Sequence, residues 1–301
     1  MNSLDEVWSV CPICFDKFVS DVIDYHIEEC LELNESNMFT PEKKKYAEYE
    51  LNETCKTAYK YCLKKSKILS KNVYPYLLMQ FIALDYTEDD LKSVINYIKN
   101  DANVTINIHH EIIAKNLLKD DHYKNCFEIG TKHIAIALDP RFIAESSMFN
   151  KLYDNASSID RVKYGSINLF NSSFGNPLCI GYGDSILVLK NEVKKRISFT
   201  IGDSFGMQFH IGTFEHSAIF LINIAEPLIH ALIKFVRTKE AFTPAKVCEL
   251  YTLGGIGYVE VQVHGLIRLN EDVEKLIIHK KNISKNIIAF CDKNNIELVE
   301  L

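Results

Sequence analysis

The feature that most constrains this chain is a set of four residues near its start: Cys11, Cys14, His26 and Cys30. Their spacing puts two cysteines on a tight knuckle, and a histidine and a cysteine four residues apart on one face of a helix. Structural zinc takes four nitrogen or sulfur ligands in a tetrahedron, and this set can supply them. A unit of about 30 residues buries too little apolar surface to fold alone. The sequence therefore predicts a closed, structural Zn²⁺ site; a chance spacing of common residue types is the alternative.

The remaining cysteines indicate reduced thiols. The chain has nine cysteines, an odd number, and its first residues lack the basic and apolar regions of a secretory signal peptide. The longest apolar stretch, 217–236, is interrupted by polar residues, so no membrane span is expected. We therefore expect an intracellular protein. Export by a signal-less route, as bacterial effectors use to reach a host cytosol, stays compatible with the sequence.

Charge argues against a nucleic-acid partner. Among 301 residues, 34 are Lys or Arg and 40 are Asp or Glu, which gives a net charge of −6. Sequence-independent binding to nucleic acid needs a basic face. No nucleic-acid partner is therefore expected.

Hydrophobic periodicity divides the chain into three parts: a zinc finger over 8–32, a helical subdomain over 41–101 and a larger domain over 103–301. The helical part predicts one helix over 41–71, a second over 76–83, and a third beginning at Thr87, whose hydroxyl can cap it. In the larger part, several segments alternate apolar and polar residues as strands do. Predicted helices lie between them, but without the regular βαβ spacing of a parallel sheet. The fold class is therefore α+β with a mixed or antiparallel sheet. Its expected strands include 134–138, 185–189, 218–222 and 257–264, and its expected helices include 227–235, 244–251 and 270–277.

The first 32 residues resemble a known family. The run from Cys11 to Leu31 is similar to the UBZ ubiquitin-binding zinc finger of the Cys-Cys-His-Cys kind. In that family the single helix lies on the apolar patch of ubiquitin, assisted by an acidic residue two positions before the last cysteine. The resemblance implies ubiquitin contacts from Val22, Tyr25 and Glu28. A finger that binds DNA, RNA or nothing is the alternative, but the acidic helix would repel phosphate, which favours a protein partner.

The most informative late segment is a strand expected around residues 258–264. On it, Glu260, Gln262 and His264 share one face, and valines occupy the other. Burying three polar side chains on an apolar strand costs free energy, so their burial would indicate that they have a functional role. A solvent-facing polar edge is the alternative.

Several segments between residues 103 and 280 resemble a bacterial family long carried as a domain of unknown function. The resemblance rests on 105–109, 123–131, 139–141, 161–169, 199–204 and 260–265. Members of that family include CteC-like ubiquitin threonine ADP-ribosyltransferases. The resemblance implies an ADP-ribosyltransferase-like core that uses NAD as co-substrate. The chain has His109-His110-Glu111-Ile112 where the family usually has His-Pro-Asp-Arg, so the residue that replaces that arginine is left open.

ADP-ribosylation breaks the bond between nicotinamide and ribose through an oxocarbenium-like state, which a nearby carboxylate stabilises. We therefore expect Glu260 to be catalytic and Gln262 to position the acceptor. The residues expected to bind NAD are His109, Tyr123, Thr131, Arg161, Tyr164, Asn168 and Ser204.

These NAD-contact residues have structural alternatives. His109 could be a satisfied core histidine, and Tyr164 could serve packing. Arg161 could be a surface cation or a phosphate clamp. Ser204 follows Gly202-Asp203, a pair of residues typical of turns, so it could simply belong to a turn.

The two resemblances lead to one hypothesis: NAD-dependent transfer of ADP-ribose to ubiquitin, on a threonine, which blocks ubiquitin conjugation. The finger would recruit ubiquitin, and tethering would raise its local concentration to about millimolar. Two alternatives stay open: an ADP-ribosyltransferase that acts on another protein, and an inactive ubiquitin-binding adaptor.

Overall fold

A computed structural model describes residues 51–129, 135–202, 204, 210–222, 224–253 and 259–301, together with two short strands nearer the start. The chain divides into two compact units, Met1–Tyr49 and Glu50–Leu301. In the first unit, β1 (Trp8–Val10) and β2 (Lys17–Val19) pair antiparallel. The four predicted zinc ligands, and the predicted ubiquitin contacts Val22, Tyr25 and Glu28, lie outside the described residues.

The second unit is built on one mixed sheet of eight strands, in the order β10-β9-β5-β3-β4-β8-β6-β7. Its strands pair antiparallel except β10 and β9, which run parallel. The α+β class is thereby confirmed. The strands are β3 (Asn103–Ile108), β4 (Lys163–Asn168), β5 (Ser185–Leu189), β6 (Ile197–Ile201), β7 (Ile211–Thr213), β8 (Val259–Val263), β9 (Val273–Ile278) and β10 (Glu297–Glu300).

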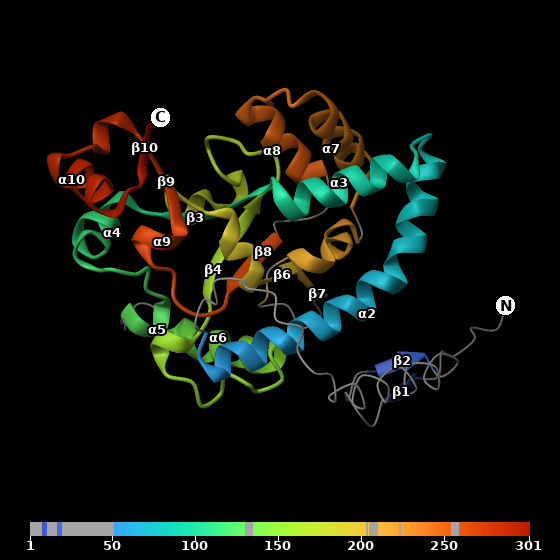
Figure 1. Ribbon diagram of the computed structural model, residues 1–301, viewed down its shortest axis with the longest axis horizontal. Helices are drawn as coiled ribbons and strands as arrows, with labels where there is room; N and C mark the ends of the chain where they lie inside the picture. The colour runs from blue at the N-terminus through green and yellow to red at the C-terminus, as the bar shows by residue number, and fades with distance from the viewer. Residues whose placement is uncertain are drawn as a thin grey trace, which may run out of the picture. The chain divides into compact units, whose positions relative to one another are not determined.

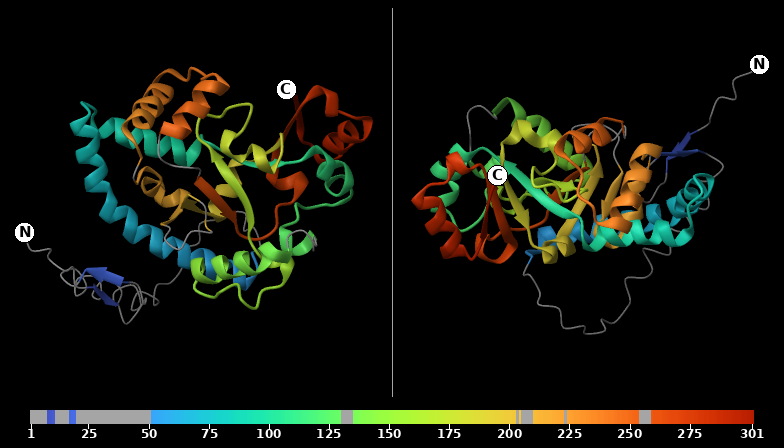
Figure 2. Two further views of the ribbon diagram at one scale, coloured as in Figure 1. Left: turned by 180° about the vertical axis from the view of Figure 1, so that it is seen from behind. Right: turned by 90° about the horizontal axis from the view of Figure 1, so that it is seen from above.

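Helices surround this sheet, as Figures 1 and 2 show. The α-helices are α2 (Glu53–Ala83), α3 (Glu88–Asn100), α4 (His110–Lys115), α5 (Cys126–Ile129), α6 (Ala135–Met148), α7 (Glu226–Thr238), α8 (Pro244–Leu253), α9 (Leu269–Asp272) and α10 (Lys285–Asn294). The 3₁₀ helices are η2 (Leu117–Lys119), η3 (Ser158–Asp160), η4 (Pro177–Tyr182), η5 (Asn191–Arg196), η6 (Phe214–Leu221) and η7 (Lys280–Asn282).

The two faces of the sheet carry different side chains. One face is apolar, and α3, α7 and α8 pack on it to form the main core, with residues such as Val261, Phe199 and Ile167. A second cluster joins α6 to the first half of α2 through Met148, Cys62 and their neighbours. The polar face of β8 lies between these layers. The architecture therefore buries the predicted catalytic strand on both sides.

The helices at the start of the second unit belong to the same core as the sheet. Leu77, Phe81 and Leu91, from α2 and α3, are buried in the main cluster. The predicted cap of α3 is present as a capping box: the Thr87 hydroxyl accepts from the Asp90 backbone, and the Asp90 carboxylate accepts from the Thr87 backbone. The unit boundary therefore lies at 49/50, whereas the sequence placed boundaries on either side of 41–101.

Four sequence-based element assignments were wrong. The helices predicted over 41–71 and 76–83 have no break between them, because α2 runs on through the exposed Pro75. Proline has no N–H to donate to the helix, and both Pro75 and Lys71, the residue one turn before it, are exposed. Within the strand predicted at 134–138, the described residues 135–138 form the start of α6, since alternating Ile and Ala residues also suit a helix. The apolar run 218–222 is 3₁₀ helix, and 270–277 is mostly strand β9, because periodicity does not separate short apolar segments.

Within the described residues, the helices are all too short or too polar to cross a bilayer.

Candidate active site

The polar face of β8 is buried, as expected if its side chains form a functional site. Glu260 is 2% exposed, and Gln262 and His264 are fully buried. The neighbouring strands continue this face, with Ser166 of β4 and Thr200 of β6 both opposite Glu260. The alternative of a solvent-facing polar edge is therefore wrong.

A pocket opens onto this face, and its volume is about 130 Å³. Pockets that enclose drug-sized ligands measure roughly 300–1,000 Å³, so this one suits a single ring or sugar. Strands β3, β4 and β8, helix α6 and η4 contribute to its walls. The lining residues are Ile106, Asn107, Tyr123, Arg141, Tyr164, Gly165, Ser166, Cys179, Tyr182 and Glu260.

Arg141 of α6 faces Glu260 across this pocket. Its guanidinium nitrogen Nη1 lies 3.7 Å from Glu260 Oε2. The same nitrogen donates to Ser204 Oγ at 3.1 Å, and the guanidinium carbon lies 4.1 Å from the centre of the Tyr164 ring. Arginine suits this place because its flat, delocalised cation can stack on a ring and still donate in its own plane. The pocket therefore pairs one carboxylate with one cation.

Gln262 holds the other side of the Glu260 carboxylate. Its amide nitrogen donates to Glu260 Oε1 at 3.1 Å and to Thr200 Oγ1 at 3.2 Å. Ser198 Oγ donates to the Gln262 carbonyl oxygen at 3.0 Å. Gln262 is thus a buried partner of Glu260 and not one of the pocket-lining residues.

Tyr164 is fixed by a second, buried carboxylate. Its hydroxyl donates to Glu145 Oε1 at 2.9 Å, and Glu145 Oε2 accepts from Arg161 Nη1 at 2.6 Å. Burial, with the Glu145 charge beside it, raises the pKa of Tyr164 well above 10, so the phenol keeps its proton. Arg161 in turn lies against the rings of Phe127 and Phe142. Tyr164 therefore lines the pocket, whereas Arg161 supports it from behind and is neither a surface cation nor part of the pocket wall.

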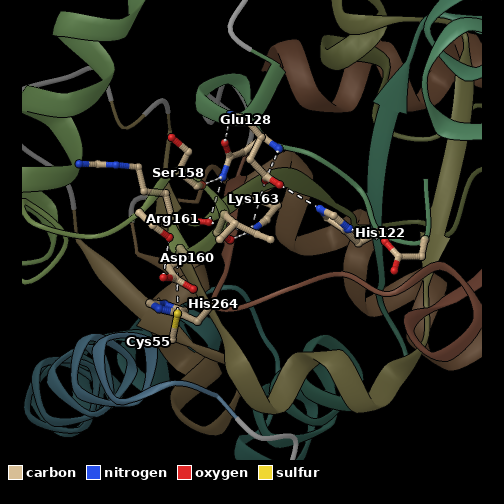
Figure 3. Close-up of polar contacts among 12 residues, drawn as sticks. Cys55, His122, Glu128, Ser158, Asp160, Arg161, Lys163 and His264 are labelled. Carbon is tan, nitrogen blue, oxygen red and sulfur yellow. Dashed lines mark hydrogen bonds and ion pairs between the residues drawn. The ribbon is translucent and has the colours of Figure 1, made fainter. Parts of the chain in front are cut away.

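A polar cluster fixes the segment that carries Tyr123, the other predicted aromatic residue of the pocket (Figure 3). His122 Nε2 lies 2.9 Å from Glu128 Oε1, and His122 Nδ1 lies 2.7 Å from Asp121. The second oxygen of Glu128 lies 3.7 Å from the ammonium of Lys163 at the start of β4. The Lys163 side chain is fully buried and donates to backbone carbonyls of residues 159 and 161. The cluster thereby ties the 121–128 segment to the sheet.

The remaining predicted NAD contacts have different positions. His109 follows the last residue of β3, is exposed, and does not line the pocket, so it is not a core histidine either. Asn168 is buried, but its side-chain nitrogen donates to the Ser172 carbonyl and its side-chain oxygen accepts from the Ser172 backbone N–H. These two hydrogen bonds close a turn. Ser204 is buried and accepts from Arg141. Thr131 lies outside the described residues.

Among the pocket residues that sequence reasoning missed are Arg141 and Asn107. Asn107 donates to the Gly183 carbonyl at 3.0 Å, but its own Oδ1 has no hydrogen-bond partner among the described residues. Two signals could have found them: Asn107 shares the strand face of Thr105, and Arg141 is the one cation in the largely apolar run 134–144.

The described residues contain no group of three or more His, Cys, Asp or Glu side chains that could hold a metal ion. The predicted Zn²⁺ ligands are not among those residues, so the zinc site remains a prediction.

In the comparison with family models, residues 104–300 match the family described as Protein of unknown function (DUF3626). The chain belongs to the DUF3626 family. The family region begins within β3 and ends with β10, so it contains all eight strands of the sheet except Asn103, and all of the pocket-lining residues. No curated protein matches the chain.

Proposed function

We propose that this protein is an NAD-dependent ADP-ribosyltransferase that modifies ubiquitin on a threonine hydroxyl and so blocks ubiquitin conjugation. One observation carries the proposal. A buried carboxylate, Glu260, lies in a ring-sized pocket beside a fixed cation and an aromatic face. The ADP-ribosyltransferase character of the fold and the threonine acceptor rest on the resemblance of the sequence motifs.

Transfer of ADP-ribose from NAD to a threonine would proceed in the following way. The bond between the nicotinamide nitrogen and ribose C1′ breaks, and nicotinamide leaves with the bonding electrons. The threonine oxygen forms the new bond to C1′, and its proton passes to a base, for which Glu260 is the pocket's carboxylate. The same carboxylate would stabilise positive charge as it develops on the sugar. Gln262 would keep one carboxylate oxygen oriented through the hydrogen bond that it donates.

In this proposal the pocket would hold one end of NAD. Tyr123 and Tyr164 offer aromatic walls, and Asn107 Oδ1 is an unpartnered acceptor among the described residues. A carboxamide N–H or a sugar hydroxyl would satisfy that oxygen. The volume of about 130 Å³ suits the nicotinamide ring or the ribose, so the rest of the dinucleotide would lie outside the pocket. We assign to Arg141 the role of the arginine that the 109–112 segment lacks.

The finger would supply the substrate. Cys11, Cys14, His26 and Cys30 would hold Zn²⁺ and stabilise the helix, and Val22, Tyr25 and Glu28 would contact ubiquitin. A tether of this kind converts a weak encounter into a local one at about millimolar concentration.

Release of nicotinamide tests the reaction itself. The full chain is incubated with NAD and ubiquitin, and free nicotinamide is measured by chromatography. We expect release with the wild type, a loss of at least about 100-fold with Glu260→Gln, and no change with Glu249→Gln on the exposed surface of α8. Release that is equal in wild type and Glu260→Gln would overturn the assignment of Glu260. Ubiquitin binding without release would favour the inactive adaptor.

A further inference from the structure

A chain of hydrogen bonds runs from the pocket carboxylate to a histidine behind it. His264 follows the last residue of β8 and is fully buried. Its Nε2 lies 3.0 Å from Ser198 Oγ, and its Nδ1 lies 2.8 Å from the hydroxyl of Tyr153. Ser198 in turn contacts Gln262, which contacts Glu260.

The proton positions in this chain follow from the acceptor at its end. A carboxylate accepts only, so the Gln262 amide must turn its nitrogen to Glu260 and its oxygen to Ser198. Ser198 has a single proton, which that oxygen takes. His264 Nε2 must then carry a proton and donate it to Ser198 Oγ. Nδ1 is left as an acceptor, and the Tyr153 hydroxyl donates to it.

The charge state of the two rings supports this direction. Burial, with the Arg196 cation nearby, lowers the pKa of His264 to about 3, so the imidazole is neutral. Burial raises the pKa of Tyr153 well above 10, so its hydroxyl keeps the proton that it donates. Near neutral pH the ring of His264 is therefore neutral, and the hydrogen bonds keep this direction.

We infer that His264 is a positioning residue: through Ser198 it holds the Gln262 amide with its N–H, and not its carbonyl, facing the Glu260 carboxylate. Without the Nε2 proton, the Ser198 hydroxyl would turn to His264. The Gln262 carbonyl would then lose its donor, and the amide would be held only by the two acceptors of its nitrogen, Glu260 and Thr200, so its orientation beside the carboxylate would be less firmly fixed. The consequence for turnover rests on the proposed function, but the proton position does not.

Two substitutions of the same histidine separate positioning from packing. His264→Gln keeps a donor near the place of Nε2, whereas His264→Asn is too short to reach it. Both remove the ring from its contacts with Tyr59, Phe149 and Tyr153, so both should lower the unfolding temperature similarly. We expect His264→Asn to lower kcat for nicotinamide release by roughly 10- to 100-fold at nearly unchanged KM for NAD, and His264→Gln to retain most of kcat. Equal loss of kcat in both variants would overturn the inference.

The tautomer is measured independently of any activity, by nitrogen NMR of the histidine-labelled full chain. We expect the His264 ring with a proton on Nε2 and none on Nδ1. A proton on Nδ1, or on both nitrogens, would overturn the inference. If the wild type transfers no ADP-ribose, the proposed function fails, and the tautomer still decides the role of His264.

Discussion

The guanidinium of Arg141 and the carboxylate of Glu260 lie 3.7 Å apart, although one residue comes from helix α6 and the other from strand β8. Both side chains are largely buried, at 14% and 3% exposed. A buried charge without its partner is strongly destabilised, so each of the two groups requires the other. The pocket therefore contains a negative and a positive charge next to each other, from Glu260 and Arg141.

Replacing Arg141 with lysine should impair the site even though the charge is kept. A lysine ammonium is a compact charge that does not stack on Tyr164 while also donating to Ser204. We expect Arg141→Lys to lower kcat/KM for NAD by at least about tenfold, measured as nicotinamide release. Arg237→Lys is the matched control, because Arg237 pairs with Asp90 in an exposed position remote from the pocket residues. Equal activity of Arg141→Lys and the wild type would remove Arg141 from the site.

The cluster around His122 should make stability depend on pH. Burial tends to lower the pKa of His122, but the hydrogen bonds and charges of Asp121 and Glu128 outweigh burial and raise it. A raised pKa in the folded state adds stability that is complete below the ordinary histidine pKa and is lost as the pH rises through the folded value. We therefore expect His122→Gln to lower the unfolding temperature more at pH 6 than at pH 9. A difference that is constant or grows with pH would contradict this.

A glycine of β7 should tolerate no side chain. A Cβ on Gly212 would lie 2.2 Å from the ring of Phe199, which is fully buried in the main core. We expect Gly212→Ala to lower the free energy of unfolding by about 1–3 kcal/mol, measured by urea denaturation. Gly181→Ala is the control, since a Cβ there meets nothing within 4 Å and should change stability by less than about 0.5 kcal/mol. Similar values for both variants would show that the Gly212 contact is relieved easily.

The zinc finger can be tested by metal analysis of the full chain. We expect one zinc per chain in the wild type and none when Cys14 and Cys30 are both replaced by serine, because the site then loses two of four ligands. The same double variant should lose binding to immobilised ubiquitin. Replacement of the exposed Cys248 by serine is the control and should keep both properties. Zinc retained in the double variant would refute the predicted ligand set.

Which residues of strand β8 share a face could be predicted from the sequence, because this depends on local alternation alone. The valines and the polar residues of β8 lie on opposite faces, as a period of two requires. Other local signals, the apolar run of strand β5 and the capping hydroxyl of Thr87 at the start of α3, also placed their elements correctly.

The partners of that strand could not be predicted, because they come from remote parts of the chain. Arg141 belongs to a helix whose first residues alternate like a strand. His109 would lie on the same face as Asn107 if β3 continued, but the strand ends at Ile108 and helix α4 begins. Where a strand ends depends on packing and not on its pattern.

The central claim is tested most directly by the intact mass of ubiquitin after incubation with the full chain and NAD. We predict an increase equal to one ADP-ribose with the wild type and no increase with Glu260→Gln, while Glu249→Gln behaves as the wild type. Ubiquitin of unchanged mass, from a chain that binds both zinc and ubiquitin, would contradict the account and leave this protein a ubiquitin-binding adaptor or a transferase with another acceptor.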